Sequence, residues 1–133
     1  MSAPAVLPHV DAVTAALTGA GLAVGLGGAP KTVPTSGIYT AVYADGGQAL
    51  PESLADRRTG LQLLFQVTCV APTAEKALWA ADKTRAALAA PLAVPGRALW
   101  RAEELGGPPL ARDDDVTPPL YFLPIQYRLR STT

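Results

Sequence analysis

The chain is short of the side chains that build disulfide frameworks, metal centres and nucleophilic sites. Its 133 residues include one cysteine and one histidine. A single cysteine excludes a disulfide framework and a cluster of thiolate ligands. A single histidine leaves only one candidate base for a catalytic triad. Because no acid–base pair, metal-ligand set or cofactor motif has the required spacing, we expect neither enzymatic activity nor a bound metal or cofactor.

Charge of one sign and long hydrophobic runs are also lacking. Eleven basic residues balance eleven acidic ones, so the formal net charge is zero. This balance gives no general attraction to nucleic acids and little protection against self-association. No apolar run approaches the roughly 20 residues of a membrane span, and the N-terminus lacks the pattern of a secretory signal. We therefore expect a soluble domain, made inside the cell and not inserted in a membrane.

The residues that are present suit a small packed core with long loops. Hydrophobic residues make up 49% of the chain and charged residues 17%, which is a globular composition. The length predicts a single domain over residues 1–133. The chain has 12 glycines and 13 prolines, and we predict loops at residues 27–37, 45–59 and 105–119, where several of them lie.

Two segments have the pattern of helices. In the first, residues 7–19, apolar side chains recur at spacings of four, three and four, at Val6, Val10, Val13 and Leu17. The second helix begins after Thr73, which is a good N-cap residue, and Pro91 ends it.

The clearest strand covers residues 60–71, where the side chains alternate between an apolar and a mixed face. The mixed face suggests that a partner covers it. Shorter strands are predicted at residues 22–26, 38–44, 97–104 and 120–130. Pro124 has no N–H to donate, so the last strand should be an edge strand or carry a bulge there.

The order of these segments predicts an α+β fold. Strand, helix and strand follow one another directly from residue 60 onward, as in a crossover unit. We expect a mainly antiparallel or mixed sheet of four or five strands, packed by two helices.

Several apparent motifs have simpler structural explanations. Residues 25–32 approach a phosphate-binding loop, but Pro30 replaces the second glycine and no helix can open at Lys31, so a surface loop is expected. His9 is expected to be a capping or surface residue. Cys69 is expected to be a small buried hydrophobe. Glu103 and Glu104 are adjacent on a predicted strand, so they should point to opposite faces.

The candidate interface residues are polar and occur in three groups. Arg57 and Arg58 lie in the predicted loop 45–59, and an acidic run occupies the predicted loop 105–119. A one-sided ladder follows on the last strand. Each group is either a solvated surface or a contact with a partner. The set is Arg57, Arg58, Asp113, Asp114, Asp115, Gln126, Arg128 and Arg130. Trp79 and Trp100 are equally compatible with an interface or with core packing.

Five stretches together resemble a known family. They are "VDAVTAALTGAGL", "IYTAVYADG", "GLQLLFQVTCVAPTAEKALWAADKTRAALAAPL", "ARDDD" and "LYFLPIQYRLRS". In their order, over nearly the whole chain, the protein resembles the small tail terminator (tail completion) proteins of long-tailed bacteriophages. The strand–Thr–helix step is the part that resembles the family best.

The resemblance implies a structural protein of the virion, assembled in the host cytoplasm. Such proteins form a hexameric ring at the head-proximal end of the tail. The ring caps the tail tube, ends its polymerisation and offers a docking surface to head completion or neck proteins. The candidate interface residues would then contact neighbouring copies, the tube or the neck, and DNA would pass through the ring without specific recognition.

Three other interpretations remain open. A neck or head-closure adaptor on the portal side would share the same size and composition. A small-ligand-binding α/β domain would need a concave pocket with convergent polar groups. A nucleic-acid module is disfavoured by the neutral charge and the low aromatic content of 6%.

Overall fold

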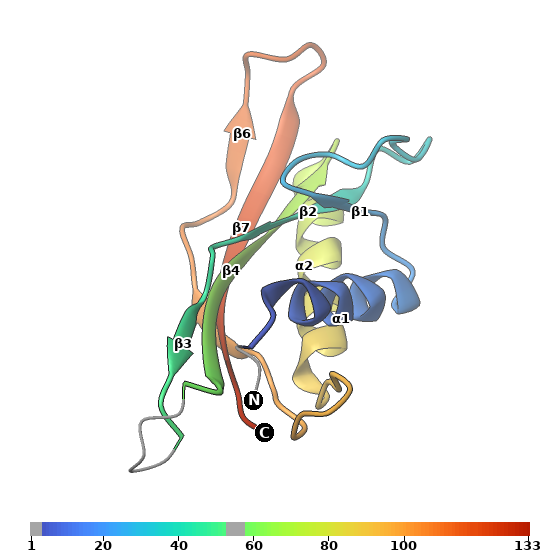
Figure 1. Ribbon diagram of the computed structural model, residues 1–133. Coiled ribbons are helices and arrows are strands. Elements are labelled where there is room, and N and C mark those ends of the chain that lie inside the picture. Colours follow the sequence, from blue (N-terminus) through green and yellow to red (C-terminus); the bar gives the residue numbers. More distant parts are fainter. Residues whose placement is uncertain (1–3, 53–57) are drawn as a thin grey trace.

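Two long antiparallel strands form the centre of the sheet. The computed structural model describes residues 4–52 and 58–133, and in these the chain forms two helices and seven strands (Figure 1). The elements are α1 (Val6–Gly19), β1 (Val24–Leu26), β2 (Tyr39–Ala44), β3 (Gln48–Leu50), β4 (Gly60–Ala71), α2 (Ala74–Ala89), β5 (Glu103–Gly106), β6 (Ala111–Asp113) and β7 (Leu120–Ser131). The register of β4 with β7 runs unbroken from the pair Leu61–Ser131 to the pair Ala71–Tyr121.

The sheet is mixed, with the order β1-β2-β4-β7-β5. β1 is parallel to β2, and the remaining pairs are antiparallel. Since β4 and β5 are each antiparallel to β7, they are parallel to one another, and α2 connects them across one intervening strand. The predicted α+β class and the crossover are confirmed.

The sheet has more strands than the four or five predicted. β3 pairs with β4 and β6 pairs with β7, inside segments predicted to be loops. Three residues contain too little alternation to identify a strand from sequence. The strand predicted at residues 97–104 is wrong in position, because β5 begins at Glu103 and Trp100 makes only an isolated bridge with Leu92.

The prediction that the last strand lies at an edge or carries a bulge at Pro124 is also wrong. β7 lies between β4 on one side and β5 and β6 on the other. β5 pairs with residues 126–128 and β6 with residues 120–122, which leaves Pro124 between the two short strands. A proline there interrupts neither pairing, so it is compatible with a central strand.

Both helices pack on one face of the sheet (Figure 1). From α1, Val10, Val13 and Leu17 are buried, as the spacing predicted. α2 begins after Thr73, whose Oγ1 accepts a hydrogen bond from the Lys76 N–H at 3.3 Å. The α2 residues that face the core are mostly small, which lets this helix approach the sheet closely. They are Ala77, Ala80, Ala81, Thr84 and Leu88.

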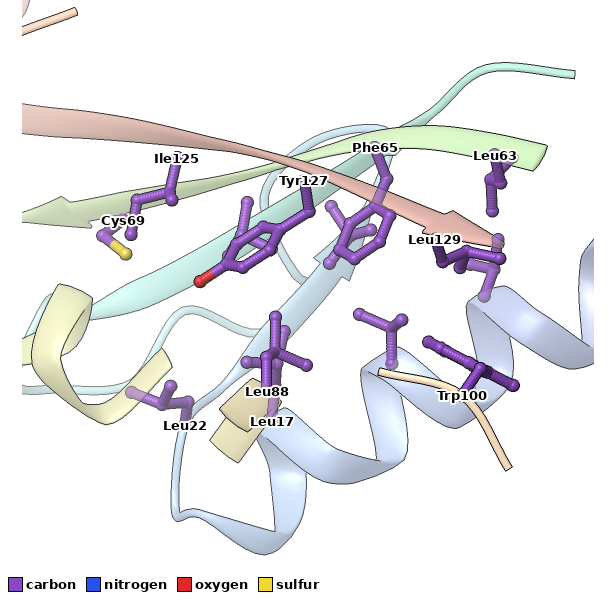
Figure 2. Close-up of a cluster of buried hydrophobic side chains, with 14 of the residues drawn as sticks. Leu17, Leu22, Leu63, Phe65, Cys69, Leu88, Trp100, Ile125, Tyr127 and Leu129 are labelled. Carbon is purple, nitrogen blue, oxygen red and sulfur yellow. The ribbon is translucent and has the colours of Figure 1, made fainter. Parts of the chain in front are cut away.

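The core lies between these helices and the apolar side of β4 and β7. Figure 2 shows Phe65, Tyr127 and Leu129 of the sheet on the same side as Leu17 and Leu88 of the helices. The Phe65 and Tyr127 rings stack with their centroids 5.3 Å apart. None of the described helices is both long and apolar enough to cross a membrane.

Candidate functional site

The sheet face turned away from the helices is exposed in a single copy around Leu64, Gln126 and Arg130. On β4 the side chains of Leu63 and Leu64 are neighbours in sequence, but Leu63 is fully buried under the helices and Leu64 is 44% exposed. Residues opposite one another in register point to the same face. We call the side that carries Leu64 the open sheet face. By register it includes Tyr39, Ala41, Tyr43, Gln48, Gln62, Leu64, Gln66, Thr68, Val70, Glu103, Phe122, Pro124, Gln126, Arg128 and Arg130, of which Ala41, Val70 and Pro124 are buried.

The polar ladder predicted on the last strand lies on this face. Arg128 Nη2 donates to both carboxylate oxygens of Glu103, each at 2.9 Å. Arg130 Nε donates to the amide oxygen of Gln62 at 3.1 Å. Gln126 lies opposite Gln66 on β4. The ladder is therefore partly engaged within the copy, but all of its members remain at the surface.

Apolar side chains lie beside the ladder and form a shallow hollow. Leu64 is opposite Arg128 in register, and Tyr43 is opposite Gln66. Together with Leu105 they line a hollow of about 380 Å³. Aromatic and arginine side chains next to exposed aliphatic ones are the composition typical of protein interfaces.

The acidic run occupies the tip of the β6–β7 hairpin. Asp113 ends β6, and its Oδ1 accepts a hydrogen bond from the Asp115 N–H at 3.0 Å. Arg112 Nε lies 2.7 Å from Asp114 Oδ1 in an ion pair that is exposed on both sides. In a single copy the tip is thus an exposed turn held by its own side chains, which is compatible with both sequence interpretations.

The structure does not bring the two charged groups together within one copy. The hairpin tip and the arginine end of β7 are separated by the length of the strand, about 33 Å from residue 120 to residue 130 at ~3.3 Å per residue. Arg58 is exposed just before β4 begins. Arg57 lies outside the described residues.

A buried polar cluster links both ends of the chain and was not predicted. His9 is fully buried, so its predicted surface or capping role is wrong. Its Nδ1 lies 2.7 Å from the Ala5 carbonyl oxygen and its Nε2 lies 2.8 Å from Ser131 Oγ. Ser131 Oγ also accepts from Arg97 Nε at 2.5 Å, and Arg97 Nη2 donates to the Thr59 carbonyl oxygen at 2.7 Å.

These contacts fix the protonation of the histidine. The Ala5 carbonyl only accepts, so the proton of a neutral imidazole is on Nδ1, and Nε2 accepts from the Ser131 hydroxyl. Burial lowers the pKa of His9, the hydrogen bond to the Ala5 carbonyl raises it, and the nearby Arg97 charge lowers it, with a net shift downward. His9 is therefore held neutral.

The Ser131–His9 pair has the atoms of a nucleophile and its base, but it is closed to substrates. Ser131 is 1% exposed, and its Oγ is hydrogen-bonded to both His9 and Arg97. A second hollow of about 380 Å³ lies next to the cluster and is lined by His9 and Arg97, among others. Ser131 does not line it, so the arrangement serves to fasten α1, β7 and the segment before β5 to one another.

The remaining sequence candidates have structural roles. Glu103 and Glu104 point to opposite faces, as predicted, and Glu104 Oε1 accepts from Arg85 Nε of α2 at 2.9 Å. Cys69 is buried as predicted, and burial raises the pKa of its thiol. Trp100 is buried, whereas Trp79 is 46% exposed with Lys83 Nζ 5.5 Å from its ring centre.

The segment that approaches a phosphate-binding loop is built for packing instead. A Cβ at Gly25 would lie 2.1 Å from the Gly28 carbonyl oxygen, so the glycine is required by the close approach of the backbone. Lys31 and Thr32 are exposed and no helix follows them. Within the described residues, no group of three His, Cys, Asp or Glu side chains could hold a metal ion.

The open sheet face could be only partly predicted from the sequence. The mixed face of β4 and the ladder on β7 follow from alternation. Leu105 and Glu103 join them only through the register of β5, which shifts between Glu104 and Gly106. No pattern in the sequence specifies such a shift.

Comparison with known proteins adds information on the fold alone. No family model and no curated protein matches the chain. Four chains of solved structures match it. One of them, whose name states no function, is 18% identical, with a TM-score of 0.58 over 93% of this chain and 96% of its own length. At this identity the likeness extends to the fold and not to the activity.

Proposed function

We propose that this protein is a structural subunit of a bacteriophage tail, a tail terminator that assembles into a ring on the tail tube. In this proposal the ring ends tube polymerisation and presents a surface to head completion proteins. The observation that carries the proposal is the open sheet face, because the part of this mixed apolar and polar face around Leu64 is exposed in one copy.

The chemistry of the face supports assembly. Leu64, Tyr43 and Leu105 are each close to half exposed and lie together around one hollow. Burying them against a partner would stabilise a complex by roughly 25 cal/mol for each Å² of apolar surface. The neighbouring arginine and glutamines can adjust their hydrogen bonds to polar groups of that partner.

The geometry offers two different surfaces that could serve as the two sides of a contact in a ring. The open sheet face lies on one side of the molecule, and the β6–β7 hairpin projects beyond the helices at one end (Figure 1). Where each copy uses these two surfaces for two different neighbours, the contacts are head-to-tail, and repeated head-to-tail contacts close into a ring or extend as a filament. A neck or head-closure adaptor on the portal side would use the same surfaces, so the partner separates the two roles.

The proposal is tested by polymerising the tail tube protein in the presence of this protein. We expect ring-shaped caps at tube ends in electron micrographs and tubes that stop growing. The variant Leu64→Arg should cap far fewer ends, because a charge would be buried in the contact. Leu78→Arg on the outer face of α2 is the matched control, since Leu78 is 48% exposed against 44% for Leu64.

Two results would contradict the proposal. Tubes that grow equally long with and without the protein would remove the terminator role. Binding to a connector protein and not to tube protein would favour the portal-side adaptor.

A small-ligand-binding role is the second candidate, because the hollow on the open sheet face has a volume of about 380 Å³, within the range of ligand pockets. Its lining includes the polar side chains of Gln66, Gln126 and Asp45. A thermal-shift screen with small polar aromatic compounds tests this role. Stabilisation of the native chain that Leu64→Arg abolishes would favour it.

A further inference from the structure

We propose that in the assembled ring the β6–β7 hairpin tip of one copy binds the arginine end of the open sheet face of the next copy. The hairpin tip is residues 113–119, and the arginine end is Arg128, Arg130 and Gln62. The inference rests on the proposed ring, and it adds which two surfaces of the chain meet.

The receiving surface offers positive charge and apolar area side by side. Arg130 Nε is hydrogen-bonded to Gln62, a neutral partner, and Arg130 is exposed. Arg128 is paired with Glu103 and lies opposite Leu64 in register. The arginine end therefore carries two guanidinium groups, of which, among the described residues, only that of Arg128 is paired with a carboxylate. The exposed Leu64 lies beside them.

The hairpin tip is complementary in both respects. It carries three carboxylates, and the ion pair with Arg112 engages only one of them, Asp114. Val116, beside these carboxylates in the turn, is 41% exposed. An acidic turn with one apolar side chain fits a basic surface with one apolar side chain, and such charge complementarity selects the partner and its orientation.

The tip needs little ordering to bind. The Asp113 carboxylate already holds the turn through the Asp115 N–H at 3.0 Å. Pro118 and Pro119 restrict the chain on the other side of the turn. A preorganised tip loses less conformational entropy on binding than a flexible loop would.

The two surfaces lie at opposite ends of β7, so the tip of a copy cannot contact the arginine end of the same copy. Each copy has one tip and one arginine end, separated by about 33 Å of strand. Every contact between a tip and an arginine end is therefore between two different copies. When two copies make this contact once, one tip and one arginine end stay available for further copies. Repeated single contacts of this kind close into a ring or extend as a filament.

Single charge reversals with a rescue test the contact. Asp115→Arg and Arg130→Glu are each made in the full chain, and tube-end occupancy is measured by electron microscopy across protein concentrations with tube protein present. We expect each variant alone to need about tenfold more protein for half occupancy, because like charges meet at the contact. Asp82→Arg on the exposed side of α2 is the matched control and should behave as the wild type.

Rescue is the sharper measurement. An equal mixture of the two variants restores the contact, because the basic tip of the Asp115→Arg variant meets the acidic surface of the Arg130→Glu variant. The unaltered tips and surfaces of the two variants also pair with one another. The variant that carries both substitutions should also occupy tube ends, because the charges of its tip and of its arginine end are reversed together. Both the mixture and the double variant should return to within about threefold of the wild type, a residual difference of the size that altered context commonly leaves. Unchanged urea-unfolding midpoints would show that all variants fold.

The outcomes separate this inference from the function on which it rests. If the wild-type protein caps tubes and the two variants cap equally well, the tip contact is overturned and the terminator role stands. If the variants cap normally but fail to join heads, the tip binds a neck protein and the contact between copies is again overturned. If the wild-type protein itself forms no cap, the proposed function fails.

Discussion

The two faces of the sheet formed by β4 and β7 differ in burial, although the same two strands make both. Leu63 and Leu129 point toward the helices and are fully buried, whereas Leu64 and Arg128, one residue away, remain at the surface. On the helix side the partner belongs to the same chain, so packing there contributes to folding. On the open side we propose that the partner is another molecule. In this proposal, a shift of one residue along a strand separates the side chains that stabilise the fold from those that contact another copy.

The largest expected difference between the two faces is in the unfolding free energy lost when Leu63 or its neighbour Leu64 is truncated. Leu63→Ala removes a fully buried side chain and should lower the free energy of unfolding by about 2–5 kcal/mol. Leu64→Ala should change it by less than about 0.5 kcal/mol, because the side chain is close to half exposed. Urea denaturation of both variants measures this. Equal losses would contradict the assignment of the two faces.

A smaller difference in unfolding free energy is expected at the end of β7, where the exposed Arg130 precedes the buried Ser131. Ser131→Ala leaves His9 Nε2 and Arg97 Nε without their hydroxyl partner and should cost roughly 1–3 kcal/mol. Arg130→Ala should cost less than about 0.5 kcal/mol, since it loses only an exposed hydrogen bond to Gln62. The same denaturation experiment applies. A stable Ser131→Ala protein would show that the cluster does not fasten α1 to the sheet.

The smallest expected effect is a dependence of the unfolding free energy on pH, which arises from the buried His9 of α1. Burial gives His9 a pKa in the folded state below the 6.5 of the unfolded chain. Between the two values the unfolded state binds more protons, so the stabilisation is complete above pH 6.5 and declines as the pH falls below it. The difference in unfolding free energy between wild type and His9→Phe should change between pH 8 and pH 5, with the wild type losing more. A constant difference would contradict a neutral buried His9.

The sequence predicted those parts of the fold that depend on local periodicity. The stripe of Val10, Val13 and Leu17, the Thr73 cap and the alternation of residues 60–71 led directly to the two helices and the central strand. The short strands β3 and β6 and the central place of β7 were missed. They depend on pairing between distant segments, which a local pattern does not contain.

The candidate surface was predicted to a similar extent. Alternation placed Gln126, Arg128 and Arg130 on one face, and that prediction is confirmed. The burial of His9 could not be predicted, because its partner Ser131 is 122 residues away in sequence. The partner Glu103 of Arg128 was missed for the same physical reason, since only the sheet register brings them together.

The crossover from β4 through α2 to β5 has a consequence for the order of events during synthesis. β7 is translated after every other strand of the sheet, yet it occupies the place between β4 and β5. Until residues 120–131 leave the ribosome, β4 has no neighbour on that side and β5 and β6 have none to pair with. Neither the hairpin nor the row of arginines exists before that moment. If copies join through the contact that we propose, a nascent chain cannot yet make that contact with another copy.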